Sequence, residues 1–252
     1  MRRRDRYYLF GDLKAMNYFY KSVFLVMKTI FLSSIVIFSS YAQSISQLEK
    51  ECNSNKFISC GILGSRYHLG EGIGQNKIKA SVLYQKACSG GDSLGCAVLG
   101  AMYINGEGVQ QDKIKAAEFS KKACDGGETG GCVNLGLMHD NGEGVRQDKV
   151  KAVELYQKAC KGGEAVGCGN LGAMYDSGVG VLQDKFKAVE FYQKACEGGY
   201  GVGCTNLGVM YANGEGVSQD KSKALELYGN ACNLKNEEGC KKYANLKNQG
   251  VR

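Results

Sequence analysis

The 252-residue chain carries 32 lysine and arginine residues against 25 aspartates and glutamates, a formal net charge of +7. Most of this excess lies in residues 1–42, which hold seven basic and two acidic residues and leave 25 basic and 23 acidic residues in the rest. Such a balanced charge predicts no polyanion-binding surface, which excludes nucleic acid as a partner.

The first 42 residues have the layout of a signal peptide. Lys28 is followed by an apolar run, and residues 40–42 (Ser-Tyr-Ala) give the small-x-small pattern of a cleavage site. Met27 stands directly before this pattern and is a candidate for the true translation start. The alternative is an uncleaved anchor over 23–41, which is about long enough to span a bilayer. Because Lys28 lies inside that stretch, we predict cleavage and a secreted or periplasmic protein without a stable membrane anchor.

Twelve cysteines show that residues 43–252 are a repeat array. They form pairs eight residues apart, and each pair recurs after 36 residues: Cys52 and Cys60, Cys88 and Cys96, Cys124 and Cys132, Cys160 and Cys168, Cys196 and Cys204, and Cys232 and Cys240. A leucine, a glycine and an alanine also recur at this period, at Leu63, Gly64 and Ala80 and their equivalents. A fixed period of this length predicts a solenoid. The five predicted repeats span about 60–95, 96–131, 132–167, 168–203 and 204–239.

Each repeat is predicted to form two helices, A and B. In the third repeat, Cys132, Leu135, Gly136 and His139 recur at the spacing of an apolar helical stripe, and helix A ends at the turn 141–144. Helix B follows Asp148, a favourable N-cap, and ends at a Gly-Gly pair. The glycine on the helix A stripe predicts close approach of another helix, because glycine costs helix propensity. No part of the array alternates with period two, so the fold class is all-α.

Both ends of the array are predicted to be capped. Residues 43–52 supply a short helix B before the first complete repeat, and Cys240 to Lys247 continue the register with polar residues. A polar terminal helix is what a solenoid needs at its end. The prediction is one helix before the five repeats, ten within them and one after.

The cysteine pairs are predicted to be disulfides. An even cysteine count in an exported chain favours a disulfide framework. Zinc is the alternative, but structural zinc needs about four converging ligands, typically at C-x2-4-C spacing, whereas the spacing here is C-x7-C. The first cysteine of each pair falls on the last turn of helix B and the second on the first turn of the next helix A. We therefore expect six local bridges at the repeat junctions and no metal.

The repeat resembles the Sel-one-like repeat, a relative of the tetratricopeptide repeat, on three motifs: L-G-x-M-Y (171–175), G-x-G-V-x-Q-D (178–184) and K-A-x-x-x-Y-x-K-A-C (187–196). This resemblance implies a right-handed α/α superhelical solenoid whose A helices line the concave side. The added C-x7-C resembles the Helicobacter cysteine-rich protein family, whose members are known as secreted β-lactamase-like or penicillin-binding proteins. The match covers Cys52 to about Leu246. It implies β-lactams or cell-wall peptides as ligands, with weak β-lactam hydrolysis as an alternative function.

The residues themselves provide little chemistry for such an enzyme. Ser218 and Lys221 match S-x-x-K formally, but other residues occupy the serine position in the equivalent loops, and no K-T-G exists. The two histidines, His68 and His139, belong to different repeats, which argues against a zinc site and leaves few ways to build a catalytic triad. The glycines of 70–74 join two helices and are no phosphate loop. The sequence predicts neither a catalytic residue nor a cofactor.

A helical wheel of helix A places Val133, Asn134 and Leu137 on the face opposite the predicted core stripe. An asparagine recurs on this face, with small apolar neighbours, at Asn134, Leu137, Asn170, Ala173, Asn206 and Val209. A row of amides offers donors and acceptors to the backbone of an extended peptide. The alternative is that these asparagines are merely hydrated or bond within the repeat. The function that we predict is binding of a peptide or protein ligand in the concave groove.

Overall fold

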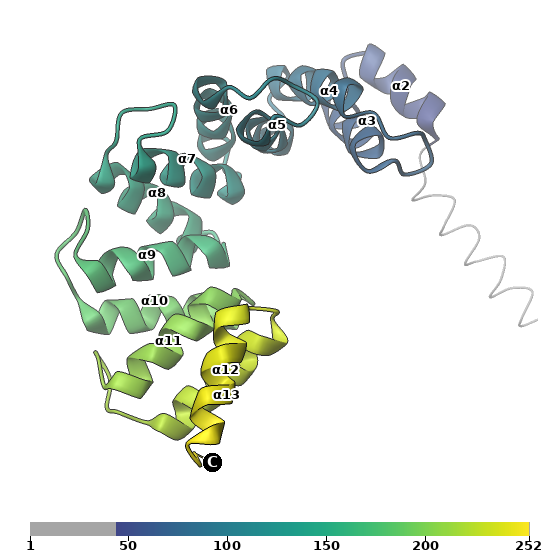
Figure 1. Ribbon diagram of the computed structural model, residues 1–252. Coiled ribbons are helices and arrows are strands. Elements are labelled where there is room, and N and C mark those ends of the chain that lie inside the picture. Colours follow the sequence, from purple (N-terminus) through teal and green to yellow (C-terminus); the bar gives the residue numbers. More distant parts are fainter. Residues whose placement is uncertain (1–43, 252) are drawn as a thin grey trace, which may run out of the picture. The chain divides into compact units, whose positions relative to one another are not determined.

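The computed structural model describes residues 44–251, and within this range the chain forms twelve α-helices in consecutive pairs (Figure 1). The A helices are α3 (Phe57–Leu69), α5 (Ser93–Asn105), α7 (Thr129–Asn141), α9 (Ala165–Ser177), α11 (Gly201–Asn213) and α13 (Glu237–Asn248). The B helices are α2 (Ile45–Asn53), α4 (Lys77–Ser89), α6 (Lys113–Asp125), α8 (Lys149–Lys161), α10 (Lys185–Glu197) and α12 (Lys221–Asn233). The pairs α3–α4 to α11–α12 are repeats one to five. The fold is all-α, as predicted.

The predicted signal peptide, 1–42, and the candidate start at Met27 lie outside the described residues. Over 44–251, no helix is both long and apolar enough to cross a membrane.

The structural repeats begin slightly earlier than the boundaries drawn at the cysteines. Helix α3 begins at Phe57, three residues before Cys60, and helix α5 begins at Ser93, three residues before Cys96. The same offset holds for the later repeats, because the turn that ends each helix B is short and the next helix A has already made most of one turn when it reaches its cysteine. Boundaries at 60 and 96 therefore fall inside the first turn of a helix, and the natural start of a repeat lies three residues upstream.

Local side-chain bonds set where each helix begins and ends. The carboxylate of Asp148 accepts a hydrogen bond from the backbone N–H of Lys151 at 2.9 Å, which confirms the predicted N-cap of helix B. Helix A ends in a left-handed glycine, Gly142 at φ 72°. In addition, the Gln147 amide donates to the carbonyl of Asp140 at 2.8 Å, and a glutamine makes the same bond in all five repeats. This bond satisfies a carbonyl that the helix end leaves without a partner.

The recurring glycine of helix A lies against a tyrosine ring of helix B, as the predicted close approach requires. A β-carbon on Gly136 would lie 2.7 Å from the Tyr156 ring, and one on Gly172 would lie 2.7 Å from the Tyr192 ring. The second repeat has Ser120 in place of the tyrosine. In the repeats with a tyrosine its ring fills the space of a side chain, and in the second repeat a β-carbon on Gly100 would lie 2.9 Å from the Ser120 hydroxyl oxygen.

Neighbouring repeats are joined through the loop between helices A and B. In the third repeat, a β-carbon on Gly144 would lie 2.0 Å from the carbonyl oxygen of Lys113, so only glycine allows this loop to rest on α6 of the preceding repeat. Next to it, the Lys113 ammonium lies 2.9 Å from the Glu143 carboxylate. A β-carbon on the equivalent Gly72 of the first repeat would meet no described atom within 4 Å, and the position equivalent to Lys113, Tyr41, lies outside the described residues.

All twelve cysteines form the six predicted disulfides, with Cα–Cα separations of 4.5 to 4.7 Å. The bridges join Cys52 to Cys60, Cys88 to Cys96, Cys124 to Cys132, Cys160 to Cys168, Cys196 to Cys204, and Cys232 to Cys240. Each one connects the end of a helix B to the beginning of the next helix A. Because all twelve cysteines are disulfide-bonded, they are not zinc ligands.

The bridges belong mainly to the core of the array: eight of the twelve cysteines are buried, and the other four, Cys160, Cys196, Cys232 and Cys240, are partly exposed. Cys60 and Cys96, for example, are buried on the first turns of α3 and α5. In the loop-entropy model, a ring of this size contributes about 2–3 kcal/mol. Disulfides at this density persist in oxidising compartments, which indicates a location outside the cytoplasm.

Candidate binding groove

The A helices are brought together on one side of the stack. Successive A helices from α5 to α13 pack against one another, whereas successive B helices lie farther apart. Helix A therefore lies on the inner side of the curvature of the repeat array, and its solvent-exposed stripe faces the groove. In α9 this stripe consists of Val166, Asn170, Ala173 and Ser177, spaced i, i+4, i+7 and i+11. We call the equivalent positions of all A helices the groove stripe.

The structure places all six predicted groove residues on this stripe. Asn134, Asn170 and Asn206 are half-buried, Ala173 is exposed, and Leu137 is 38% exposed. Val209 is partly covered because it packs against the last core cluster, which contains Tyr228 and Leu246. The prediction for Val133 is wrong, since this side chain is only 6% exposed. Its position on helix A faces the next repeat, where the equivalent Gly169 lies against Tyr200.

The three asparagines differ in their bonding. The side chain of Asn206 hydrogen-bonds the hydroxyl of Tyr192 from the preceding repeat, so this residue follows the alternative of bonding within the array. The Tyr192 hydroxyl also donates to Asp176 at 3.5 Å, and burial, followed by this carboxylate, raises the pKa of Tyr192. Within residues 44–251, the amides of Asn134 and Asn170 have no hydrogen-bond partner in the protein. Two adjacent repeats therefore present unpaired amides to the groove.

The first two repeats give the groove stripe a different chemistry, and its apolar residues Ile58, Leu69 and Leu94 were not predicted. Their stripe carries large apolar side chains that are strongly exposed, with Ile58 at 73%, Leu94 at 60% and Leu69 at 61%. Ile62 and Val98 stand where the later repeats have asparagine. The spacing i, i+4, i+7 would have found these residues had it been applied to the first repeats. The groove therefore has an apolar half in repeats one and two and an amide half in repeats three to five.

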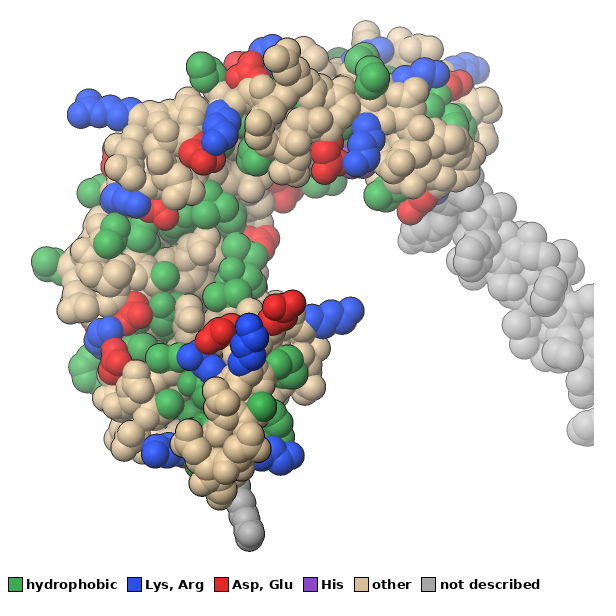
Figure 2. All heavy atoms as spheres, viewed as in Figure 1, with side chains coloured by type: hydrophobic (Ala, Val, Ile, Leu, Met, Phe, Trp, Pro, Cys, Tyr) green, Lys and Arg blue, Asp and Glu red, His purple; other side chains and the backbone are tan. Residues whose placement is uncertain are grey.

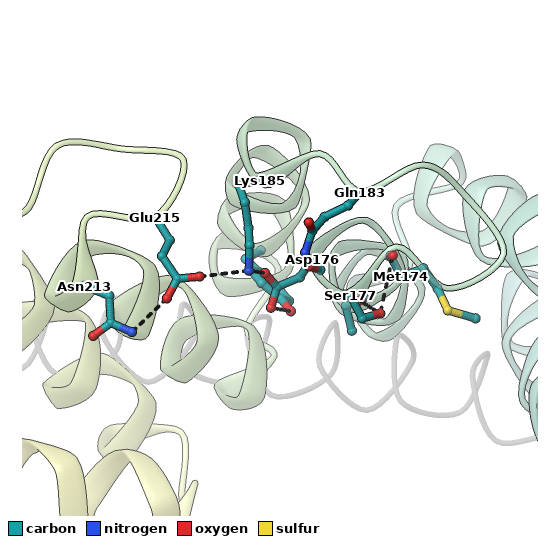
Figure 3. A network of polar contacts seen from close by, with 9 residues as sticks. Met174, Asp176, Ser177, Gln183, Lys185, Asn213 and Glu215 are labelled. Atoms are coloured by element: carbon teal, nitrogen blue, oxygen red, sulfur yellow. Dashed lines mark hydrogen bonds and ion pairs between the residues drawn. The ribbon is translucent and has the colours of Figure 1, made fainter.

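A polar network connects the fourth and fifth repeats beside the amide half (Figure 3). The Lys185 ammonium lies 2.5 Å from Asp176 and 2.8 Å from Glu215, and these two hydrogen bonds raise the pKa of Lys185. Glu215 also accepts a hydrogen bond from the Asn213 amide at 3.0 Å. Figure 2 shows acidic and basic side chains interspersed on the visible face. Such a surface provides no single-sign field for steering a polyanion.

The candidates for β-lactam chemistry do not come together. Ser218 is exposed in the loop before α12 and forms no hydrogen bond with Lys221. His68 lies 3.4 Å from Glu107, whereas the buried Nδ1 of His139 has no hydrogen-bond partner, and neither histidine bonds a serine in the part of the chain that the structure describes. The glycines of 70–74 connect α3 to α4, as expected of a helix-joining turn. Residues 44–251 also contain no cluster of three His, Cys, Asp or Glu side chains suited to a metal.

Comparison with protein families gives five copies of the Sel1 repeat, at residues 59–92, 93–128, 130–164, 165–200 and 201–236. No curated protein matches the chain in sequence.

Several solved structures are similar. A Sel1 repeat protein from Oxalobacter formigenes is 25% identical with a TM-score of 0.77, over 84% of this chain and 85% of its own length. A protective antigen of uropathogenic Escherichia coli strains, described as displaying an SLR fold, is 30% identical with a TM-score of 0.74. That comparison covers 82% of this chain but only 44% of the antigen. The cysteine-rich protein B of Helicobacter pylori is 33% identical over 52% of this chain and 93% of its own, with a TM-score of 0.43.

Proposed function

The chain belongs to the Sel1 repeat family, and we propose that it binds an extended segment of a peptide or protein along the groove stripe, in the periplasm or outside the cell. The observation that carries this proposal is the pair of unpaired amides, Asn134 and Asn170, at equivalent positions of adjacent repeats. An asparagine amide can donate to a peptide carbonyl and accept from a peptide N–H at the same time. Repeated at the pitch of the solenoid, such amides hold a peptide backbone with little dependence on its sequence.

The apolar half of the groove adds side-chain selectivity to this backbone binding. Ile58 and Leu69, at opposite ends of α3, and Leu94, on α5, are all strongly exposed, and exposed apolar patches mark interaction sites. A ligand with apolar side chains toward the first repeats and an extended backbone over the third and fourth repeats fits both halves. Because the disulfides fix each repeat junction, the groove is preorganised and loses little entropy on binding.

The test is selection of peptides from a random library on the oxidised protein, followed by titration of the selected peptides. Asn134→Ala combined with Asn170→Ala should weaken binding by about tenfold or more, because each lost hydrogen bond is worth about 0.5–1.5 kcal/mol. Gln157→Ala, which removes an exposed amide from helix α8 outside the groove stripe, is the matched control and should change nothing. Equal affinity of the double variant and the wild type would refute the proposal.

The resemblance to the cysteine-rich family implies a second candidate function, binding or hydrolysis of β-lactams. A chromogenic cephalosporin assay on the oxidised protein separates the two functions. Turnover that disappears in Ser218→Ala would favour the enzyme, and no turnover together with loss of peptide binding in the asparagine variant favours the binding protein.

A further inference from the structure

The outer side of the solenoid contains a second feature that the groove does not involve. Since successive B helices lie apart, a furrow runs between each pair of them, with helix A as its floor. Between α10 and α12 this furrow opens into a cavity of about 540 Å³, lined by Tyr211, Leu227 and the Cys196–Cys204 disulfide. This volume lies within the range of small-ligand pockets.

In the second and fourth repeats, the equivalent furrow is occupied by side chains of the protein itself. In the fourth repeat, Phe191 stacks on Tyr175 with ring centroids 5.5 Å apart and planes 14° apart. The Lys194 ammonium lies 5.2 Å above the Phe191 ring, and the Lys187 ammonium lies 5.2 Å from the centre of the Tyr175 ring. Phe191 and Cys160, which belongs to the disulfide of that junction, pack against the same core cluster, which contains Tyr156 and Leu171.

The second repeat builds the same four-membered stack from Lys115, Tyr103, Phe119 and Lys122. Each stack therefore consists of a tyrosine platform, an aromatic ring on it and cations beside the rings. Such pairs contribute beyond the area that they bury.

The fifth repeat lacks this stack, because two of its residues differ from those of the fourth repeat. Leu227 stands in place of Phe191, and Asn230 stands in place of Lys194. The remaining lysine, Lys223, is 2.9 Å from the Glu226 carboxylate, and no lysine lies over the Tyr211 ring in the described part of the chain. Tyr211 is thus a platform without the ring and the cations that its equivalents carry.

The third repeat also has a leucine, Leu155, at the phenylalanine position, but it covers its furrow differently. Its lysine, Lys158, reaches across the furrow and donates to the carbonyl of Cys124 at 2.6 Å. The first repeat has a cavity of about 400 Å³ at the equivalent place, but there Lys79 already lies 5.2 Å from the centre of the Tyr67 ring. The fifth repeat alone among these combines an open furrow with an uncovered tyrosine.

The cavity has an excess of negative charge, which favours a cation in the place of the lysine that Asn230 replaces. Two carboxylates, Glu197 and Glu226, and one ammonium, Lys223, line it. We infer that the furrow between α10 and α12 binds an aromatic side chain that has a positive charge next to it, carried by a peptide ligand, with Tyr211 as the stacking platform. This site lies on the outer side of the array and is independent of the groove stripe.

The chain contains no tryptophan, so the fluorescence of a tryptophan-containing probe reports its binding without interference from a tryptophan of the protein. The probe is N-acetyl-tryptophyl-lysinamide. The corresponding glutamate peptide is the charge control, and a leucyl-lysinamide competitor is the ring control. We expect the lysine probe to bind at one site per chain, the glutamate peptide to bind at least about tenfold more weakly, and the leucyl competitor to fail to displace the probe.

A double and a triple variant test the proposal, and at positions 191, 194, 227 and 230 they introduce side chains that the chain already uses in equivalent positions. Leu227→Phe with Asn230→Lys rebuilds the stack of the fourth repeat in the fifth and should reduce probe affinity at least about tenfold. Phe191→Leu and Lys194→Asn, combined with Lys187→Ala to remove the lysine that lies over the Tyr175 ring, open the furrow of the fourth repeat and should add a second site. A thermal melt of each oxidised variant checks that it is folded.

The proposal is overturned if the rebuilt fifth repeat binds the probe as well as the wild type, or if the opened fourth repeat gains no site. The groove variant, Asn134→Ala with Asn170→Ala, should leave probe affinity unchanged. Loss of probe binding in that variant would place the probe in the groove and would equally overturn the proposal, while peptide binding to the groove remains a separate measurement.

Discussion

The glycine of the helix A stripe gives the sharpest test of how the two helices of a repeat pack. In Gly172→Ala, the new β-carbon would lie 2.7 and 2.9 Å from two ring carbons of Tyr192. Since carbon atoms in contact prefer about 3.5–4 Å, the ring would have to move by about 1 Å. Tyr192 is 2% exposed, and its hydroxyl is held by Asp176 and Asn206, so the ring has little freedom to move.

Two opposing effects decide the outcome of this substitution. Overpacking in a core costs about 1–3 kcal/mol, and a displacement of this size belongs in the upper part of that range. In the opposite direction, alanine has a higher helix propensity than glycine, which stabilises the helix by about 1 kcal/mol. The net expectation is a destabilisation of about 1–2 kcal/mol, or a fall in Tm of about 2–8 °C for a chain of this size.

Denaturant unfolding of the oxidised protein measures this effect, and a second background tests its cause. With Tyr192→Ala the obstructing ring is gone, and adding Gly172→Ala should then stabilise the protein by up to about 1 kcal/mol. The sign of the alanine effect therefore reverses between the two backgrounds. If Gly172→Ala destabilises equally in both, the tyrosine ring is not what the glycine accommodates.

Three further outcomes are expected. Ser120→Ala removes a fully buried hydroxyl that has no hydrogen-bond partner, so it should raise the free energy of unfolding by about 1 kcal/mol. The control is Ser81→Ala, which should lower the free energy of unfolding because the Ser81 hydroxyl donates to a backbone carbonyl at 2.8 Å. Replacing both cysteines of the Cys160–Cys168 bridge by serine should cost about 2–3 kcal/mol in denaturant unfolding. The hydrogen bond from Lys185 lowers the pKa of Glu215 below its ordinary value of 4.5, so its contribution to stability is present above about pH 4.5 and is lost as the pH falls through the lowered pKa. Glu215→Gln should flatten the acid limb of the stability profile, and an unchanged acid limb would contradict this assignment.

The features that follow from local rules could be predicted from sequence. The N-cap at Asp148 and the glycine stop at Gly142 depend on residues within one turn of themselves, so their types are sufficient to place them. The disulfide partners are separated by a fixed short turn, so the spacing is sufficient to pair Cys160 with Cys168. The 36-residue period then extends each local result to the whole array.

The features that depend on the neighbouring repeat were missed. A helical wheel records which side of helix A faces its own helix B, but it does not record the next repeat, and for this reason it placed Val133 in solvent when it is buried. Met138, which is 4% exposed, was left out of the predicted stripe for the same reason. The bond that Asn206 makes with Tyr192 also crosses a repeat boundary, so the sequence alone could not separate it from the free amides of Asn134 and Asn170.

Comparison among the five repeats supplies information that a single copy would not contain. Positions at which all repeats agree, such as the cysteines and the glutamine equivalent to Gln147, make contacts that hold the stack together. Some positions at which the repeats differ face the groove or the furrows, as at Ile62 against Asn134 and at Phe191 against Leu227, whereas others, as at Ser120 against Tyr156, are buried. Every repeat has to make the same packing contacts. A residue that differs from its equivalents can therefore contribute to binding only where its side chain lies outside the core. The two sites proposed for this chain lie where such departures reach the surface.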